Sequence, residues 1–149
     1  MSELRELYQQ VIIDHGRNPR NFGELVHATH TKEGHNPLCG DHLFVFLQEQ
    51  EGQVVDIKFK GTGCAISMAS ASLMTLFLKG KTKKEAIILM KKINTALTAE
   101  KEPDIEREIF GDLVALFGVR NFPIRVKCAT LPWHTFEAAL YEKKEVSME

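Results

Sequence analysis

The stretch LFVFLQEQEGQVVDIKFKGTGCAISMASASL, residues 43–73, decides the fold. Its first five residues are apolar on both faces, which is typical of a central strand. After a turn at Gly52, the apolar residues Val55, Ile57 and Phe59 alternate with charged ones, as in a half-buried strand. Because so short a turn joins them, the two strands are expected to be antiparallel. The pattern then changes to that of a helix rich in small residues.

The remaining elements can be predicted outward from this stretch. Thr82 and Glu85 form a capping box, which marks a helix start. Gly80 and Gly118 are expected to end helices, and Pro132 to interrupt one. The predicted elements are a helix over 3–14, strands over 27–35, 43–47 and 55–60, a helix over 65–79, and helices starting at 82, 103, 123 and 132. This order predicts an α+β fold, with a three-stranded antiparallel sheet covered by helices.

Length and composition favour one domain spanning residues 1–149, with an ordered core over about 3–141 and a charged C-terminal tail. The net charge of -1 gives no electrostatic reason to expect nucleic acid or an anionic membrane as a partner. No stretch approaches the roughly 20 apolar residues of a membrane span. The charged N-terminus lacks the apolar core of a signal peptide, so a cytoplasmic location is expected.

Two of the three cysteines are predicted to lie at a loop and a helix end. Cys39 lies between Pro37 and Gly40, which fix a tight loop, and the carboxylate of Asp41 can turn toward the same point. Cys64 follows a glycine-rich segment at the start of the small-residue helix, where unpaired amides and the helix dipole favour a thiolate. These settings are not typical of inert core cysteines.

Cys128 follows two cations, Arg125 and Lys127, which also favour a thiolate. Three thiolates and a carboxylate suit a tetrahedral zinc site. Soft thiolates also suit iron–sulfur clusters. The sequence has no C-x-x-C spacing, so from spacing alone three inert, buried thiols stay open as an alternative.

Four stretches together resemble the U-type iron–sulfur cluster assembly proteins, the family of IscU and the N-terminal part of NifU. They are LYQQVIIDHGRNPRN (7–21), NPLCGD (36–41), GTGCAISMASAS (61–72) and GDLVALFGVRNFPIRVKCATL (111–131). The resemblance covers nearly the whole chain. Lys127 stands where IscU-type scaffolds have a histidine, and the segment between Cys64 and Cys128 is longer than theirs. Both features are similar to the SufU branch.

The resemblance implies a SufE/NifU-like fold and a zinc-dependent sulfurtransferase that accepts persulfide sulfur from a SufS-type cysteine desulfurase. Its zinc ligands would be Cys39, Asp41, Cys64 and Cys128. In the family, a desulfurase histidine replaces the first cysteine on zinc, so the sulfur acceptor would be Cys39. On this reading the chain is a sulfur carrier, monomeric or weakly dimeric, that serves downstream iron–sulfur assembly machinery rather than a stand-alone enzyme.

Supporting roles and alternatives accompany this reading. Arg125 and Lys127 are expected to stabilise a thiolate or persulfide, with anchoring of the loop as the alternative role of Arg125. His15, Arg17 and Arg20 are either structural or partner-docking residues. One alternative function is a scaffold that assembles a transient [2Fe-2S] cluster on the same ligands; another is a domain whose metal is only structural. His35 and His42 flank the first cysteine and are expected at strand ends or on the surface, with metal contact as the alternative. Trp133 is expected in the core, and the small side chains Ser67, Ser70 and Ser72 are expected to serve packing.

Overall fold

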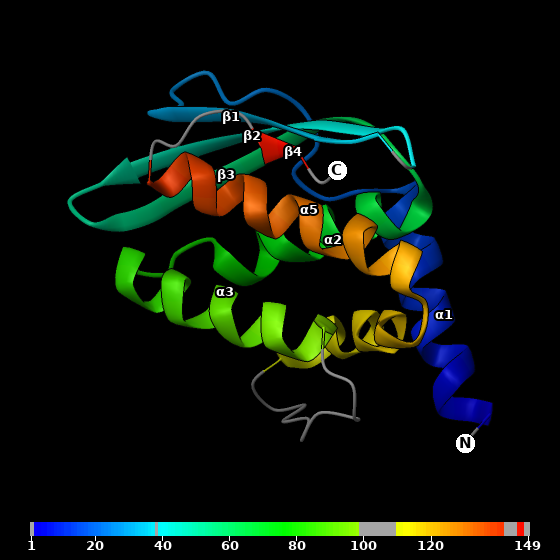
Figure 1. Ribbon diagram of the computed structural model, residues 1–149. Helices are drawn as coiled ribbons and strands as arrows, with labels where there is room; N and C mark the ends of the chain where they lie inside the picture. The colour runs from blue at the N-terminus through cyan, green and yellow to red at the C-terminus, as the bar shows by residue number, and fades with distance from the viewer. Residues whose placement is uncertain (1, 38, 99–109, 142–145, 148–149) are drawn as a thin grey trace.

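The computed structural model describes residues 2–37, 39–98, 110–141 and 146–147 (Figure 1). Its sheet is built on a meander of three antiparallel strands: β1 (His30–Asn36), β2 (Asp41–Gln50) and β3 (Gln53–Thr62). The two-residue strand β4 (Val146–Ser147) pairs with β1 in parallel, so the strand order is β3-β2-β1-β4. The predicted antiparallel meander is therefore confirmed, and the charged tail adds a short edge strand that the sequence did not indicate.

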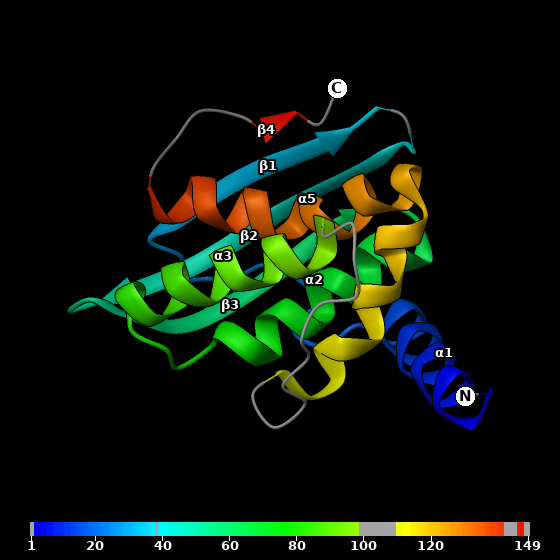
Figure 2. The same cartoon turned by 60° about the horizontal axis from the view of Figure 1, so that its bottom comes forward.

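The helices lie on one side of the sheet, which confirms the predicted α+β arrangement (Figures 1 and 2). In chain order they are α1 (Ser2–Arg17), α2 (Ala65–Leu78), α3 (Lys83–Thr98), the 3-10 helix η1 (Gly111–Asn121) and α5 (Pro123–Leu140). The capping box predicted for α3 is confirmed: the Glu85 amide donates to Thr82 Oγ1 and the Thr82 amide to Glu85 Oε1, both at 3.1 Å. No helix among the described residues is long and apolar enough to cross a membrane.

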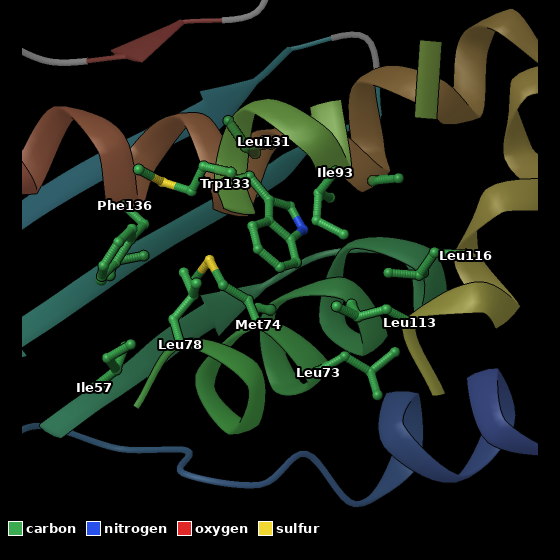
Figure 3. Packing of buried hydrophobic residues seen from close by; sticks show 14 of the residues in the cluster. Ile57, Leu73, Met74, Leu78, Ile93, Leu113, Leu116, Leu131, Trp133 and Phe136 are labelled. Atoms are coloured by element: carbon green, nitrogen blue, oxygen red, sulfur yellow. The ribbon is translucent and has the colours of Figure 1, made fainter. Parts of the chain in front are cut away.

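The core lies between the sheet and the helices, and α2 runs through its middle. Figure 3 shows Met74 and Leu78 of α2 beside Trp133 and Phe136 of α5, with Ile93 of α3 close by. Because α2 is buried on most of its surface, it needs the small side chains that the sequence places there.

Two buried serines of α2 do more than fill space. Ser70 Oγ donates to the Ala129 carbonyl at 2.6 Å and accepts from Trp133 Nε1 at 2.9 Å. Ser72 Oγ accepts from the Arg20 amide at 2.8 Å and lies 2.7 Å from His15 Nδ1. These hydrogen bonds tie α2 to α5 and to the end of α1, a role that the expectation of simple packing missed.

A bulge in β3 overturns the predicted alternation at Val55. Gln48 pairs with Asp56 and Glu49 with Val54, so Val55 is the extra residue on its strand. As a result Val54 is fully buried, while Val55 is 39% exposed. The inward positions of β3 are therefore Val54, Ile57 and Phe59.

Two predicted helix ends are wrong. Gly118 does not adopt the left-handed conformation, and η1 continues to Asn121 before Pro123 opens α5. Pro132 lies inside α5, which continues without a break to Leu140. A proline inside a helix costs about 3 kcal/mol, and the burial of Pro132 and the residues around it offsets that cost. The helix start predicted at residue 103 lies outside the described residues.

The contact between β1 and α5 aligns the two parts of the chain that carry the candidate site. A Cβ atom built on Gly34 would lie 2.0 Å from Thr135 Oγ1 and 3.1 Å from Leu131 Cδ1. Only a glycine therefore lets the strand lie this close to the helix. This approach brings the end of β1 near the first turns of α5.

Candidate metal centre

The turn between β1 and β2 carries the first two candidate ligands. Asn36 and Asp41 pair across the hairpin, and Gly40 has a φ of +70°, which a glycine adopts without strain. The Cys39 amide donates to the Asn36 carbonyl at 3.2 Å and closes the turn. Asn36 and Asp41 are fully buried on the side that faces the helices.

The neighbouring histidines lie on the opposite face of the sheet, because side chains alternate along a strand. The rings of His35 and His42 are 5.5 Å apart, and His42 Nε2 lies 2.8 Å from Glu33 Oε1. Neither histidine belongs to the group of candidate ligands described next. This agrees with the expectation that they are strand-end residues.

Cys39, Asp41 and Cys128 bring their ligand atoms within 4.8 Å of one another. The Sγ atoms of Cys39 and Cys128 are 3.0 Å apart. Asp41 and Cys128 are fully buried, whereas Cys39 is half-buried. One flank of the group is thus the hairpin turn, and the other is the N-terminal half of α5.

Cys64 borders this group without belonging to it. It is the N-cap residue of α2, and its amide donates to Asp41 Oδ1 at 2.8 Å. Its Sγ lies 3.8 Å from Ser67 Oγ. The amide at the start of α2 thus binds the carboxylate of Asp41, whereas the sequence suggested that this helix end would act on the thiol.

Burial governs the protonation of Cys128. Burial first, and then hydrogen bonds with Cys39, Asp41 and Cys64, raise the pKa of the Cys128 thiol far above its usual range. Whether the nearby cations stabilise a thiolate at Cys128 stays a prediction. Arg125 does face the thiols: a hydrogen bond to Cys128 and then the charges of Cys64 and Cys128 raise the pKa of its exposed guanidinium. Lys127 is half-buried.

Two further residues contact the site, and sequence reasoning missed both. Asn36 Nδ2 lies 3.5 Å from Asp41 Oδ2 and 3.8 Å from Cys128 Sγ. Ser67 Oγ lies 3.1 Å from Asp41 Oδ1. Strand alternation could have found Asn36, since it must share the face of Asp41 across a hairpin. Ser67 is three residues after the N-cap Cys64, so its hydroxyl returns to the same helix end.

The N-terminal candidates separate into buried and exposed residues. His15 is 4% exposed, and burial lowers the pKa of its imidazole. Its burial and its hydrogen bond to Ser72 favour a structural role over a docking role. Arg17 is exposed, and Arg20 forms an ion pair with Asp14 at 2.6 Å. A docking role for Arg17 and Arg20 stays a prediction.

The donor set fits a borderline-soft divalent ion such as zinc. Two thiols and a carboxylate lie at a spacing that one ion can bridge, and the neighbouring Cys64 offers a third thiol. Tetrahedral zinc takes sulfur and carboxylate ligands, whereas calcium and magnesium require oxygen ligands. The half-exposed position of Cys39 leaves one side of the group reachable from solvent.

Along nearly its whole length, the chain is similar to known proteins of iron–sulfur cluster assembly. The family model of the NifU-like N terminal domain matches residues 7–129. The zinc-dependent sulfurtransferase SufU of Bacillus subtilis is 43% identical, over 96% of this chain and 95% of the relative. The iron–sulfur cluster assembly scaffold protein IscU of Streptococcus pyogenes is 36% identical, over 94% of this chain and 86% of the relative.

A solved structure agrees in three dimensions. A candidate iron–sulfur cluster assembly scaffold protein for the SUF system from Fervidobacterium islandicum superposes with a TM-score of 0.81 at 34% identity. The alignment covers 91% of this chain and 98% of that one. The chain belongs to the family of the NifU-like N-terminal domain, as its resemblance to the U-type assembly proteins predicted.

Proposed function

We propose that this chain is a zinc-dependent sulfurtransferase of iron–sulfur cluster assembly and accepts persulfide sulfur from a cysteine desulfurase of the SufS type. The convergence of Cys39, Asp41 and Cys128 within 4.8 Å carries the proposal. The 43% identical relative named a zinc-dependent sulfurtransferase supports it along nearly the whole chain. We place the protein in the cytoplasm, where free thiols stay reduced.

Cys39, Asp41 and Cys128 would hold the zinc, with the adjacent Cys64 as the fourth ligand. When bound, the ion keeps cysteine ligands deprotonated at neutral pH. The protein contributes the arrangement: Cys128 is fixed in α5, Asp41 is held by the Cys64 amide, and Cys39 lies in a turn. These three parts of the chain together would hold the ion.

Cys39 is the proposed sulfur acceptor because it is the reachable thiol on the most adaptable backbone. Cys128 is fully buried within a helix, whereas Cys39 is half-buried beside Gly40. Its thiolate attacks the outer sulfur of the desulfurase persulfide. The sulfur–sulfur bond to the desulfurase cysteine breaks, that cysteine leaves as a thiolate, and Cys39 then carries the persulfide. No separate oxidant is required, since the transferred sulfur keeps its oxidation level.

Residues around the site would help the transfer and the encounter. The exposed guanidinium of Arg125 offsets negative charge on the thiolate or persulfide, and Lys127 adds a second cation nearby. Phe122 and Ile124, at the start of α5, are 62% and 65% exposed. They give a partner protein an apolar surface within two turns of Cys128.

The test is the turnover of a SufS-type desulfurase with cysteine, in the presence and absence of this chain. The wild-type chain should accelerate release of alanine and acquire a persulfide on Cys39. Cys39→Ala should give no acceleration. Asp41→Ala is the control, because it weakens the metal site while leaving the Cys39 thiol in place. Full acceleration by Cys39→Ala would overturn the acceptor role.

The second candidate is a scaffold that assembles a [2Fe-2S] cluster on the same residues. Relatives named as IscU scaffolds, at 36% identity from Streptococcus pyogenes and 34% from Thermotoga maritima, favour it. Lys127, which replaces the histidine of IscU-type scaffolds, disfavours it. Anaerobic reconstitution with iron and sulfide separates the two: a cluster that is stable and passes intact to an apo-ferredoxin would establish the scaffold instead.

A further inference from the structure

We infer that Ser67 is a positioning residue: its hydroxyl, together with the Cys64 amide, binds Oδ1 of Asp41 and leaves Oδ2 as the single oxygen offered to the metal. This inference rests on the proposed metal site, and it assigns a role to a residue outside the ligand set. It concerns how Asp41 binds rather than whether sulfur is transferred.

The two oxygens of Asp41 have different surroundings. Oδ1 receives the Cys64 amide at 2.8 Å and lies 3.1 Å from Ser67 Oγ. Oδ2 lies 3.5 Å from Asn36 Nδ2, which itself lies 3.8 Å from Cys128 Sγ. Oδ1 is therefore taken up by the start of α2, and Oδ2 faces the side of the site where Cys128 lies. Hydrogen bonds to a ligand's outer atom orient it for the metal.

The Ser67 hydroxyl has one proton and two acceptors within reach. The Cys64 carbonyl is 3.0 Å from Ser67 Oγ, and Asp41 Oδ1 is 3.1 Å away. A carboxylate oxygen is a stronger acceptor than a peptide carbonyl oxygen, and both Asp41 and Ser67 are fully buried. The proton is therefore expected to point at Asp41. If the proton pointed at the Cys64 carbonyl instead, the hydrogen bond would lie within the first turn of α2 and would not reach Asp41.

Gly63 gives independent support, because its backbone lies against this hydrogen bond. A Cβ atom at position 63 would lie 2.4 Å from Ser67 Oγ and 2.7 Å from Asp41 Oδ1. Its φ is outside the left-handed region, so the backbone conformation does not require glycine there. A side chain at position 63 is excluded because it would collide with the hydrogen-bonded Ser67 and Asp41.

Ser67 can be tested through metal binding alone, with Zn²⁺ and Co²⁺ as probes. For Ser67→Ala we expect zinc affinity, measured by competition with a chelator, to fall about 10-fold. The ligand-field bands of the Co²⁺ form should change in intensity, because Oδ1, then held by the Cys64 amide alone, can also approach the ion. Ser70→Ala is the matched control: it removes another buried serine of α2, whose partners are Ala129 and Trp133. It should leave affinity and bands unchanged.

A double-mutant cycle decides whether Ser67 acts through Asp41. If it does, adding Ser67→Ala to Asp41→Ala causes no further loss of zinc affinity. Ser67→Ala with wild-type affinity and bands would overturn the inference, and so would losses that add in the double mutant. The cycle measures zinc affinity and not desulfurase turnover. Its outcome can therefore be interpreted even if the sulfur-transfer proposal fails. Absence of metal binding by the wild-type chain would instead overturn the metal site itself.

Discussion

Replacing Gly34 by alanine tests whether the contact between β1 and α5 aligns the two halves of the metal site. The new Cβ would lie 2.0 Å from Thr135 Oγ1, whereas ordinary contact begins near 3.4 Å. Either the strand and the helix separate by about 1.4 Å, the difference of these two distances, or Thr135 rotates. Rotation breaks the bond that Thr135 Oγ1 donates to the Leu131 carbonyl at 2.8 Å.

The expected cost of Gly34→Ala follows from these alternatives. Overpacking costs about 1–3 kcal/mol, and a lost hydrogen bond about 1 kcal/mol. Alanine restricts the unfolded chain, which offsets roughly 0.4–1 kcal/mol, because Gly34 does not have a positive φ. We therefore expect the free energy of unfolding to fall by about 2 kcal/mol and Tm by about 4–8 °C for a chain of this length.

Thermal unfolding followed by circular dichroism measures this cost, and Thr135→Ala provides the control background. Without Oγ1, the nearest atoms to the new Cβ are Leu131 Cδ1 and Thr135 Cβ, at 3.1 Å and 3.2 Å. Gly34→Ala should then cost less than half as much. Zinc affinity should fall with Gly34→Ala and recover partly in the double mutant. A Tm within 1 °C of the wild type, or an equal cost in both backgrounds, would refute the reasoning.

Three further predictions concern the capping box, His15 and the metal. Thr82→Ala should lower the free energy of unfolding by about 1 kcal/mol in urea denaturation, while Thr82→Ser keeps the hydroxyl that caps Glu85 and should cost little. Burial lowers the pKa of His15 below its ordinary 6.5, so the unfolded chain binds a proton at this residue more readily than the folded chain does. The contribution of His15 to stability is therefore complete above pH 6.5. It is lost as the pH falls from there toward the folded-state pKa. His15→Gln should flatten the dependence of the unfolding free energy on pH in this range, and an unchanged slope would contradict the assignment. Zinc at about 100 times its Kd should stabilise the folded chain by about 2.7 kcal/mol, so a chelator should lower Tm, and should do so less in Asp41→Ala.

Features with local causes could be predicted from the sequence. The α3 helix is an example: its capping box involves two residues three positions apart, and its buried positions repeat at helical spacing. The β2–β3 hairpin is another, because Gly52 and the apolar pattern on both sides of it specify a turn between strands. In both cases the interaction and the residues that make it lie within one short segment.

Features that depend on packing could not be predicted. The pair Val54-Val55 is equally apolar at both positions, so its pattern does not say which valine the bulge turns inward. A proline normally breaks a helix, and the burial of Pro132, which the sequence does not show, explains why α5 continues through it.

The candidate site divides in the same way. Cys39 and Asp41 share one turn, so their proximity could be expected, whereas the approach of Cys128 depends on Gly34 meeting α5. The three cysteines and Asp41 were identified by residue type and family resemblance. Ser67 and Asn36 were missed because their residue types do not mark them as site residues. Asn36 meets Asp41 through the hairpin register, and Ser67 meets it through the start of α2.

The placement of Cys39 and Cys128 on opposite parts of the chain has a consequence for biosynthesis. They are 89 residues apart in sequence, although their sulfur atoms nearly touch. At 5–20 residues per second, a ribosome makes Cys128 about 4–18 s after Cys39. During that interval the nascent chain lacks the one proposed ligand that α5 supplies. Tight zinc binding would therefore begin only when translation is nearly complete. A chain terminated before α5 would bind zinc more weakly than the full chain.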